Sequence, residues 1–297
     1  MQRIAIVLLL LSLARCGGDA RQNEPVADAP PREVGSVPSF DGVSIHYTVA
    51  GSGEGALLFI HGWSCDRTYW TAQVDAFAAE QKVVTVDLAG HGDSGAERDA
   101  WTIPSLARDV EAVIAALDLG SVVLIGHSMG GAVALEVARR MPERVVGVIG
   151  VDTFQDVEQP DPQAWAEIVA GLRDDFPGRC GTFVSRMFLP DADAELVREV
   201  TADLCSAPPE IAVGLLTALP EYDLAQALSS VDVPVRAING TLAPTRIEAI
   251  RARNPGFDAL ILDGVGHFPM LERPDEFNRL LDRLVEELTA GAHDLVS

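Results

Sequence analysis

One serine in a glycine-rich turn is the residue of this chain best suited to chemistry. The stretch GHSMGG, residues 126–131, follows the apolar run 121–125 and precedes AVALEVARR, a helical pattern. In a strand–turn–helix of this kind the strained turn lifts the serine hydroxyl above the sheet edge, and glycines leave room for the neighbouring backbone. The pattern predicts Ser128 as a nucleophile rather than as part of a purely structural turn.

A serine that attacks a carbonyl carbon produces an oxyanion, which needs hydrogen-bond donors already held in place. Two backbone N–H groups are predicted to supply them. Met129 begins the helix after Ser128, and Trp63 follows the apolar strand 56–60 in the stretch HGW. The alternative for HGW is a simple exit from the strand, with Gly62 allowing the turn.

Proton transfer to and from the serine needs a base, and the chain has six histidines. His267 follows the last predicted strand, 259–262, in a loop between Gly264 and Gly266 that can bring its imidazole over Ser128. There it would accept the serine proton and return it to the leaving group. The other histidines lie at the wrong strand ends or beside the nucleophile, so we assign them no catalytic role.

These residues need a scaffold, and short strands alternate with helices along the chain. Such alternation is typical of a mostly parallel sheet covered on both faces. The predicted strands are 43–49, 56–60, 82–86, 121–125, 145–151, 233–238 and 259–262. The predicted helices are 69–80, 104–117, 128–141, 245–253 and 274–288.

Residues 154–230 interrupt this alternation with helical patches separated by prolines. We interpret the segment as a helical lid over the carboxyl ends of the strands, where open sheets of this kind bind ligands. A structural elaboration without a lid function is the alternative. The patches are 162–172, 192–204 and 208–219, the core is 38–153 with 231–290, and a tail follows at 291–297.

Four motifs, in this order along the chain, resemble the α/β-hydrolase fold family, in its serine esterase and lipase-like branch. They are HGW at 61–63, DLAGHGDS at 87–94, GHSMGG at 126–131 and GVGHFPMLERPDEF at 264–277. The resemblance spans about residues 43–288 and implies an α/β fold with a mostly parallel, doubly wound sheet. It also implies that 87–94 mainly shapes a loop, so we assign no chemistry to Asp87, His91 or Asp93.

The resemblance further implies an acidic residue that orients the histidine. Its commonest place in the family is after the strand 233–238, where the stretch INGTLAPT holds Ala243. Parts of the family use the end of the preceding strand instead, and here that strand ends in Asp152. Because the ends of parallel strands share one rim, Asp152 can reach His267 from there. Asp152 could alternatively cap the turn that follows it.

Two other carboxylates are weaker candidates for this acid. Glu248 lies further along the chain, in the predicted helix 245–253. Asp263 is the reserve candidate, because it is close to His267 in sequence but poorly placed to orient it. We therefore expect a catalytic set of Ser128, Asp152 and His267, with the oxyanion bound by the N–H groups of Trp63 and Met129.

The first 20 residues resemble an export signal. Arg3 precedes an apolar run at 4–13, which is shorter than the roughly 20 residues that a membrane span needs. Either Cys16 is lipidated, as in a bacterial lipoprotein, or cleavage follows Ala20. Residues 21–37, rich in proline, alanine and charge, are then a flexible tether. We expect a periplasmic or cell-envelope lipoprotein, or alternatively a secreted protein.

Export favours disulfide formation. Cys180 and Cys205 both fall within the predicted lid, so we favour a bridge between them over free thiols. Cys65 is then left over, and we interpret it as a small buried apolar residue.

Composition limits the classes of partner. The chain has 297 residues, is 48% hydrophobic and carries a formal net charge of −22, which suits a soluble globular protein and argues against nucleic-acid binding. No cluster of metal ligands is apparent, and no metal or organic cofactor is implied. Membrane attachment would come only through a lipidated Cys16, and no protein partner is inferable.

We expect a serine hydrolase that cleaves small to medium apolar carboxylic esters through an acyl-enzyme. The same catalytic set serves amide, lactone or carbon–carbon bond hydrolysis, and these alternatives stay open. A non-catalytic, ligand-binding protein of the same fold is the remaining alternative, and the alanine at 243 is what suggests it.

Overall fold

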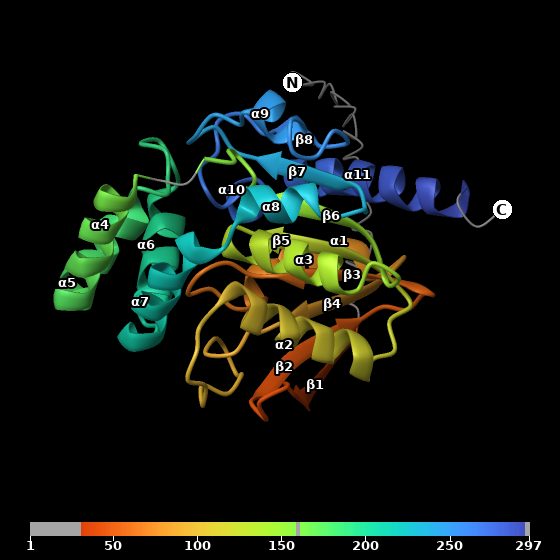
Figure 1. Ribbon diagram of the computed structural model, residues 1–297, viewed down its shortest axis with the longest axis horizontal. Helices are drawn as coiled ribbons and strands as arrows, with labels where there is room; N and C mark the ends of the chain where they lie inside the picture. The colour runs from red at the N-terminus through yellow and green to blue at the C-terminus, as the bar shows by residue number, and fades with distance from the viewer. Residues whose placement is uncertain (1–30, 159–160, 295–297) are drawn as a thin grey trace, which may run out of the picture.

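One eight-stranded sheet forms the centre of the molecule (Figure 1), seen in a computed structural model that describes residues 31–158 and 161–294. The strand order is β1-β2-β4-β3-β5-β6-β7-β8. Strands β3 to β8 run parallel, whereas β1 and β2 run antiparallel to their neighbours, so the predicted mostly parallel sheet is confirmed. The strands are β1 Arg32–Pro38, β2 Ser44–Ala50, β3 Gly55–Ile60, β4 Lys82–Val86, β5 Ser121–His127, β6 Val145–Val151, β7 Val235–Asn239 and β8 Asp258–Ile261.

Helices cover both faces of the sheet. On one face α3 packs against α2 and α8, and on the other α1 and α10 pack against α11 (Figure 1). They are η1 Arg67–Trp70, α1 Thr71–Phe77, α2 Ile103–Ala116, α3 Met129–Arg140, α8 Leu224–Ser229, α9 Ile247–Arg251, α10 Pro269–Glu272 and α11 Pro274–Asp294. Local chemistry starts α2: Thr102 caps it by accepting from the Ser105 N–H, and Pro104 lies in the first turn, where an N–H is not needed.

The central strands are buried on both sides, which explains their nearly continuous apolar sequences. Leu58 and Phe59 of β3, and Leu124 and Ile125 of β5, have no exposed surface. Fully buried strands of this kind make a rigid centre. The loops that leave their carboxyl ends are therefore held at defined positions.

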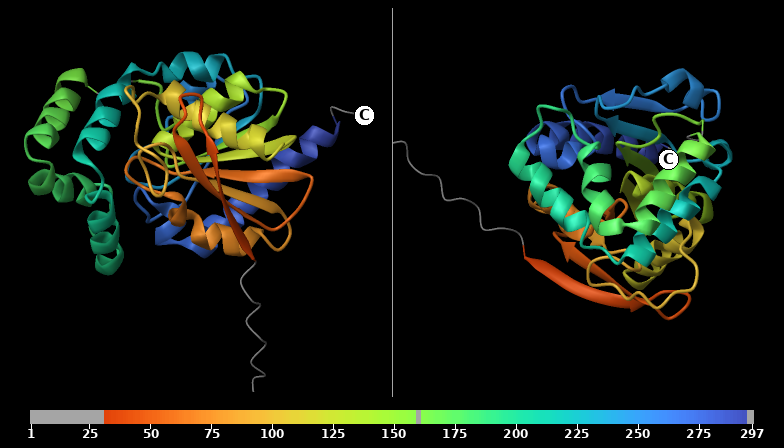
Figure 2. Two further views of the ribbon diagram at one scale, coloured as in Figure 1. Left: turned by 90° about the horizontal axis from the view of Figure 1, so that it is seen from below. Right: turned by 90° about the vertical axis from the view of Figure 1, so that its left-hand side faces the viewer.

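Between β6 and β7 the chain forms a helical insertion, which we define as residues 161–221. It contains α4 Pro162–Asp174, α5 Phe176–Ser185, α6 Ala194–Leu204, α7 Pro209–Ala218 and η2 Leu219–Glu221. These helices gather at one end of the sheet and lie across it (Figures 1 and 2). Aspartates cap α4, α5 and α6 by accepting from backbone N–H groups of the first turn, namely Asp161, Asp175 and Asp193.

A disulfide joins Cys180 of α5 to Cys205, the residue after α6, with 5.7 Å between their Cα atoms. This is the bridge predicted from the sequence. Cys65 is a buried free thiol, and burial raises its pKa well above the usual range. A buried and protonated thiol is unreactive, in keeping with the role of a small apolar residue.

Three predicted boundaries were wrong. Residues 32–37 of the predicted tether form most of β1, because their backbone pairs with β2 although proline and charge obscure the strand pattern. Residues 224–229 of the predicted lid form α8, which packs on α3 of the core. The predicted tail at 291 is also too early, since α11 continues to Asp294.

The predicted export signal, the lipidation site Cys16 and residues 21–30 of the predicted tether lie outside the described residues. Within the described part of the chain, no helix combines the length and apolar character that crossing a membrane requires.

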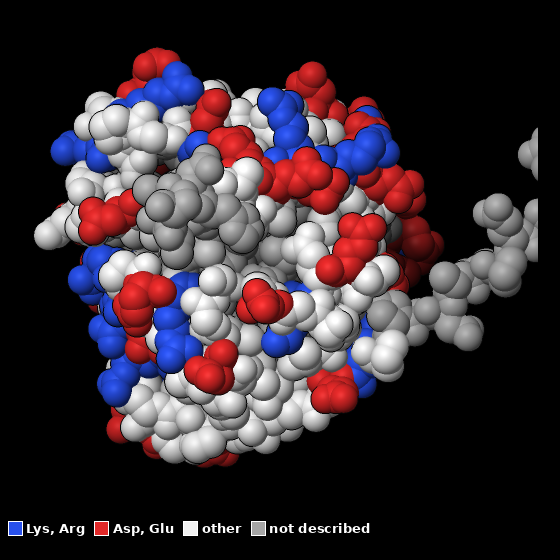
Figure 3. All heavy atoms as spheres, turned by 90° about the vertical axis from the view of Figure 1, so that its right-hand side faces the viewer, with Lys and Arg blue, Asp and Glu red and all other residues white. Residues whose placement is uncertain are grey.

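The face drawn in Figure 3 carries acidic and basic side chains interspersed with uncharged ones, without one continuous patch of either sign.

Candidate active site

Ser128 occupies a strained turn between β5 and α3. Its backbone has φ 51° and ψ −117°, a conformation that residues other than glycine rarely adopt. Its N–H donates to the Val151 carbonyl at 2.9 Å, and its carbonyl accepts from the Gly131 N–H at 2.9 Å. These hydrogen bonds hold the strained conformation in place.

Two glycines make this turn possible. A Cβ at Gly126 would overlap the backbone of Gly130, and a Cβ at Gly130 would lie 2.5 Å from the carbonyl oxygens of Ile60 and His61. The start of α3 therefore touches the end of β3. This close approach brings the loop after β3 next to the predicted nucleophile.

Asp152 and His267 are in direct contact. Nδ1 of His267 lies 2.5 Å from Oδ2 of Asp152, and because a carboxylate only accepts, we assign the ring proton to Nδ1. Oδ1 of Asp152 accepts from the Gly240 N–H at 2.9 Å and from Nε2 of Gln155 at 3.0 Å. Nε2 of His267 has no hydrogen-bond partner among the described residues, so it is available to a hydroxyl.

The pairing of β5 with β6 explains why Ser128 lies on the same sheet rim as the pair of Asp152 and His267. His127 pairs with Val151 in this register, so Ser128 and Asp152 leave adjacent strands at the same level of the sheet. Nε2 of His127 lies 2.8 Å from the His267 carbonyl, to which it donates. The loop that carries His267 is thereby attached to the residue next to Ser128.

Two segments hold the backbone of His267. The Met187 carbonyl, just after α5, accepts from the His267 N–H at 2.8 Å, and His127 donates to the His267 carbonyl. The rings of His127 and His267 are 4.8 Å apart between centroids. Neither support was predicted from the sequence. Only the position of His127 directly before Ser128 hinted at its role.

His127 is held neutral. Burial, followed by the nearby His267, lowers the pKa of His127 well below the usual range. Because its Nε2 carries the proton, its Nδ1 is an acceptor, and this atom is buried without a partner in the described part of the chain. A neutral imidazole can therefore anchor His267 without competing for a proton.

Trp63 and Met129, the two predicted oxyanion donors, are both buried. Trp63 is 6% exposed and Met129 3% exposed. Neither backbone N–H donates a hydrogen bond to any other described residue, although buried N–H groups are nearly always paired. Two buried and unpaired N–H groups, one of them on the residue directly after Ser128, are compatible with a site that receives an oxygen atom.

The loop before Trp63 is held by a second neutral histidine. Nδ1 of His61 donates to the Gly62 carbonyl at 2.8 Å, and Nε2 accepts from the Leu88 N–H at 3.0 Å. Burial lowers the pKa of His61 to about 4. Both ring nitrogens are thus engaged in fixing the backbone that leads to Trp63.

Comparison with known proteins identifies the family. The sequence model of the alpha/beta hydrolase family matches residues 57–280. The chain belongs to this family.

Its relatives include several esterases. A pimeloyl-[acyl-carrier protein] methyl ester esterase of Yersinia pseudotuberculosis is 28% identical over 82% of this chain and 98% of that protein. A putative aryl esterase from Burkholderia cenocepacia is 25% identical, with a TM-score of 0.75 over 87% of this chain and 100% of the other. An N-acyl homoserine lactone degrading enzyme is 27% identical, with a TM-score of 0.72 over 84% of this chain and 99% of the other. These relatives support an esterase-like hydrolase.

In this alpha/beta hydrolase the loop after β7 supports Asp152 instead of supplying an acid. The Gly240 N–H donates to Asp152, and the Asn239 side chain accepts from the Thr153 N–H at 3.2 Å. Glu248 instead pairs with Arg251 on α9. Asp263 makes no hydrogen bond to His267. Among the four positions weighed from the sequence, only Asp152 contacts the histidine.

The loop 87–94 of the hydrolase is built around a buried carboxylate. Asp87 accepts from the N–H groups of Arg67 at 2.8 Å and Asp93 at 2.9 Å, and it pairs with the Arg67 guanidinium. His91 donates to the Ala89 carbonyl, and burial lowers its pKa to about 3. Within the described residues, no group of three or more histidine, cysteine or acidic side chains is arranged to hold a metal ion.

Proposed function

We propose that this protein is a serine hydrolase that cleaves a carboxylic ester through an acyl-enzyme. The observation that carries the proposal is the contact between Asp152 and His267, at the sheet rim where Ser128 occupies its strained turn. A base oriented by a buried carboxylate, on the same sheet rim as a serine in a strained turn, is the arrangement that nucleophilic serine catalysis requires.

In the proposed reaction, Nε2 of His267 takes the hydroxyl proton as Oγ of Ser128 attacks the ester carbon. The N–H groups of Trp63 and Met129 stabilise the resulting oxyanion. The alcohol leaves with the proton from His267, and the acyl group remains on Ser128. Water then attacks the acyl-enzyme with His267 again as base, and the carboxylic acid is released. Asp152 stabilises the imidazolium of His267 in both acylation and deacylation.

The helical insertion supports the proposal of an apolar substrate and a lid. A side chain of α5 contacts the loop after β3, since the rings of Phe183 and Trp63 meet edge to face with 5.5 Å between their centroids. The indole N–H of Trp63 donates to the Ala212 carbonyl of α7 at 2.8 Å. An apolar acyl or alcohol group would meet these aromatic side chains.

Labelling with a fluorophosphonate tests whether the protein is an enzyme. We expect the reagent to modify Ser128 in wild type and to leave Ser128→Ala unmodified. A folded wild-type protein that is not labelled would favour the non-catalytic alternative.

A panel of p-nitrophenyl esters of increasing chain length, run beside matched anilides and lactones, tests which type of bond the protein cleaves. Preference for esters of small to medium length supports the carboxylesterase proposal. Preference for lactones would instead match the lactone-degrading structural relative.

We also propose that the protein is exported and that Cys16 carries a lipid. The disulfide between Cys180 and Cys205 supports an oxidising compartment. Metabolic labelling with a radioactive fatty acid should mark the wild type and not Cys16→Ala. Processing after Ala20 without lipid incorporation would overturn the lipoprotein proposal.

A further inference from the structure

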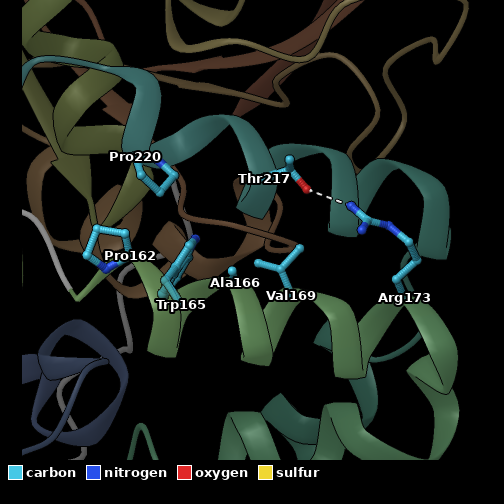
Figure 4. Close-up of a pocket in the computed structure, with 7 residues that line it drawn as sticks. All are labelled: Pro162, Trp165, Ala166, Val169, Arg173, Thr217 and Pro220. Carbon is cyan, nitrogen blue, oxygen red and sulfur yellow. Dashed lines mark hydrogen bonds between the residues drawn. The ribbon is translucent and has the colours of Figure 1, made fainter.

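A groove on the helical insertion lies between α4 and the end of α7 (Figure 4). Its floor is one face of α4, because Pro162, Trp165, Ala166, Val169 and Arg173 recur at helical spacing. Thr217 and Pro220 form the opposite wall. The volume is about 430 Å³, within the range of about 300–1,000 Å³ typical of small-molecule sites.

Most of the groove is apolar, and the indole N–H of Trp165 in its floor already has a hydrogen-bond partner. The indole N–H of Trp165 donates to the Leu216 carbonyl at 2.8 Å, which fixes the ring and leaves its surface apolar. Val169 is buried beside it. An aliphatic chain bound here would therefore remove apolar surface from water, which is favourable. It would not leave the Trp165 N–H without a hydrogen-bond partner.

One end of the groove carries a positive charge. Arg173 donates to Oγ1 of Thr217 at 3.2 Å, and that hydroxyl donates onward to the Val213 carbonyl at 2.7 Å. No carboxylate within residues 31–158 and 161–294 forms an ion pair with Arg173, although the chain has 44 acidic residues. The remaining N–H donors of its guanidinium are free to bind a carboxylate through two parallel hydrogen bonds.

We propose that this groove binds a linear aliphatic carboxylate. The chain would lie on Trp165 and Val169, and the carboxylate would take a bidentate contact from Arg173. None of Ser128, Asp152 and His267 lines the groove, so the site is separate from the candidate active site. Ester hydrolysis releases molecules of this class, but binding does not require that the protein catalyse it.

Calorimetric titration of the purified protein with octanoate tests the proposal. We expect saturable binding that Arg173→Gln weakens by about tenfold or more, because a hydrogen bond to a charged partner contributes that much. Ala166→Asp adds a carboxylate at an exposed position of the groove and should abolish binding. Arg186→Gln removes another exposed arginine of the insertion and should leave binding unchanged.

Octylammonium and 1-octanol, which share the chain and lack the carboxylate, should bind at least about tenfold more weakly than octanoate. The proposal is overturned if octylammonium matches octanoate, if no saturable heat is seen, or if Arg173→Gln and Ala166→Asp bind like wild type. The last outcome would place the carboxylate elsewhere, for example beside Ser128. Circular dichroism of each variant checks that the fold is retained.

Discussion

At the scale of single residues, Asp152 is the centre of the candidate site. It receives hydrogen bonds from three directions: His267, Gly240 and Gln155. The loop that holds Ala243 thus contributes a backbone N–H and leaves the carboxylate to the neighbouring strand. One carboxylate on this histidine is sufficient, because its task is to fix the ring and stabilise its charged form.

Asp152→Asn should lower kcat by roughly 10³ to 10⁴ with little change in thermal stability, because an amide favours the wrong tautomer of His267. Adding Ala243→Asp should restore part of the activity by supplying a carboxylate from the adjacent strand end. Ester hydrolysis measured with a p-nitrophenyl substrate checks both. Near-normal activity of Asp152→Asn would show that this carboxylate only caps its turn.

His127→Phe should lower kcat by about tenfold or more, since a base displaced by even a small distance loses its alignment. Phenylalanine keeps the ring packing with Phe268 but cannot donate to the His267 carbonyl. His127→Gln retains an N–H donor and should keep more activity than His127→Phe at equal stability. If both variants lose the same activity, the hydrogen bond from residue 127 would not be what aligns His267.

At the scale of elements, α5 connects the helical insertion to both parts of the site. Phe183 contacts Trp63, and the Met187 carbonyl just after the helix holds the His267 N–H. The disulfide between Cys180 and Cys205 ties α5 to α6 across 25 positions of the chain. The insertion is therefore part of the support for the site.

Replacing Cys180 and Cys205 together with serine should destabilise the insertion by about 3.5 kcal/mol, the chain-entropy estimate for a loop of this length. Faster cleavage by a protease within 161–221 and a lower kcat should accompany the change. Cys65→Ala is the matched control, because Cys65 is a buried free thiol that takes no part in the bridge. Unchanged proteolysis in the double variant would mean that packing alone holds α5.

At the scale of the whole molecule, neutral buried histidines link stability to pH. Burial lowers the pKa of His61 to about 4 and of His91 to about 3, and it also lowers that of His127. In the unfolded chain a histidine titrates near pH 6.5, so acid protonates the unfolded state first. Their contribution to stability is complete above about pH 6.5 and declines as the pH falls towards 4.

The free energy of unfolding should therefore decrease by about 1 kcal/mol per pH unit for each of these histidines below pH 6.5. Urea unfolding measured between pH 7.5 and pH 5 checks this expectation. His91→Gln removes one titrating group and should flatten the decline, whatever its effect at pH 7.5. An equal slope in the variant and wild type would assign the acid sensitivity to other groups.

Much of the site is local and could be read from the sequence. The turn at Ser128 depends on glycines within a few positions of it, and the buried strands β3 and β5 have unbroken apolar runs. By contrast, β1 was missed because its pairing with β2, and not its own pattern, makes it a strand. Most of the other strand and helix positions agree within a few residues, since hydrophobic periodicity is a property of neighbouring residues.

The sequence by itself determined the nucleophile turn, the alternation of strands and helices, and the set of carboxylates available to His267. Only the tertiary structure decided among those carboxylates, because the pairing of β5, β6 and β7 brings Asp152 to a histidine 115 positions away. It also showed that His127 and Met187 hold that histidine. Such contacts depend on strand register and on the packing of the insertion, which no local pattern encodes.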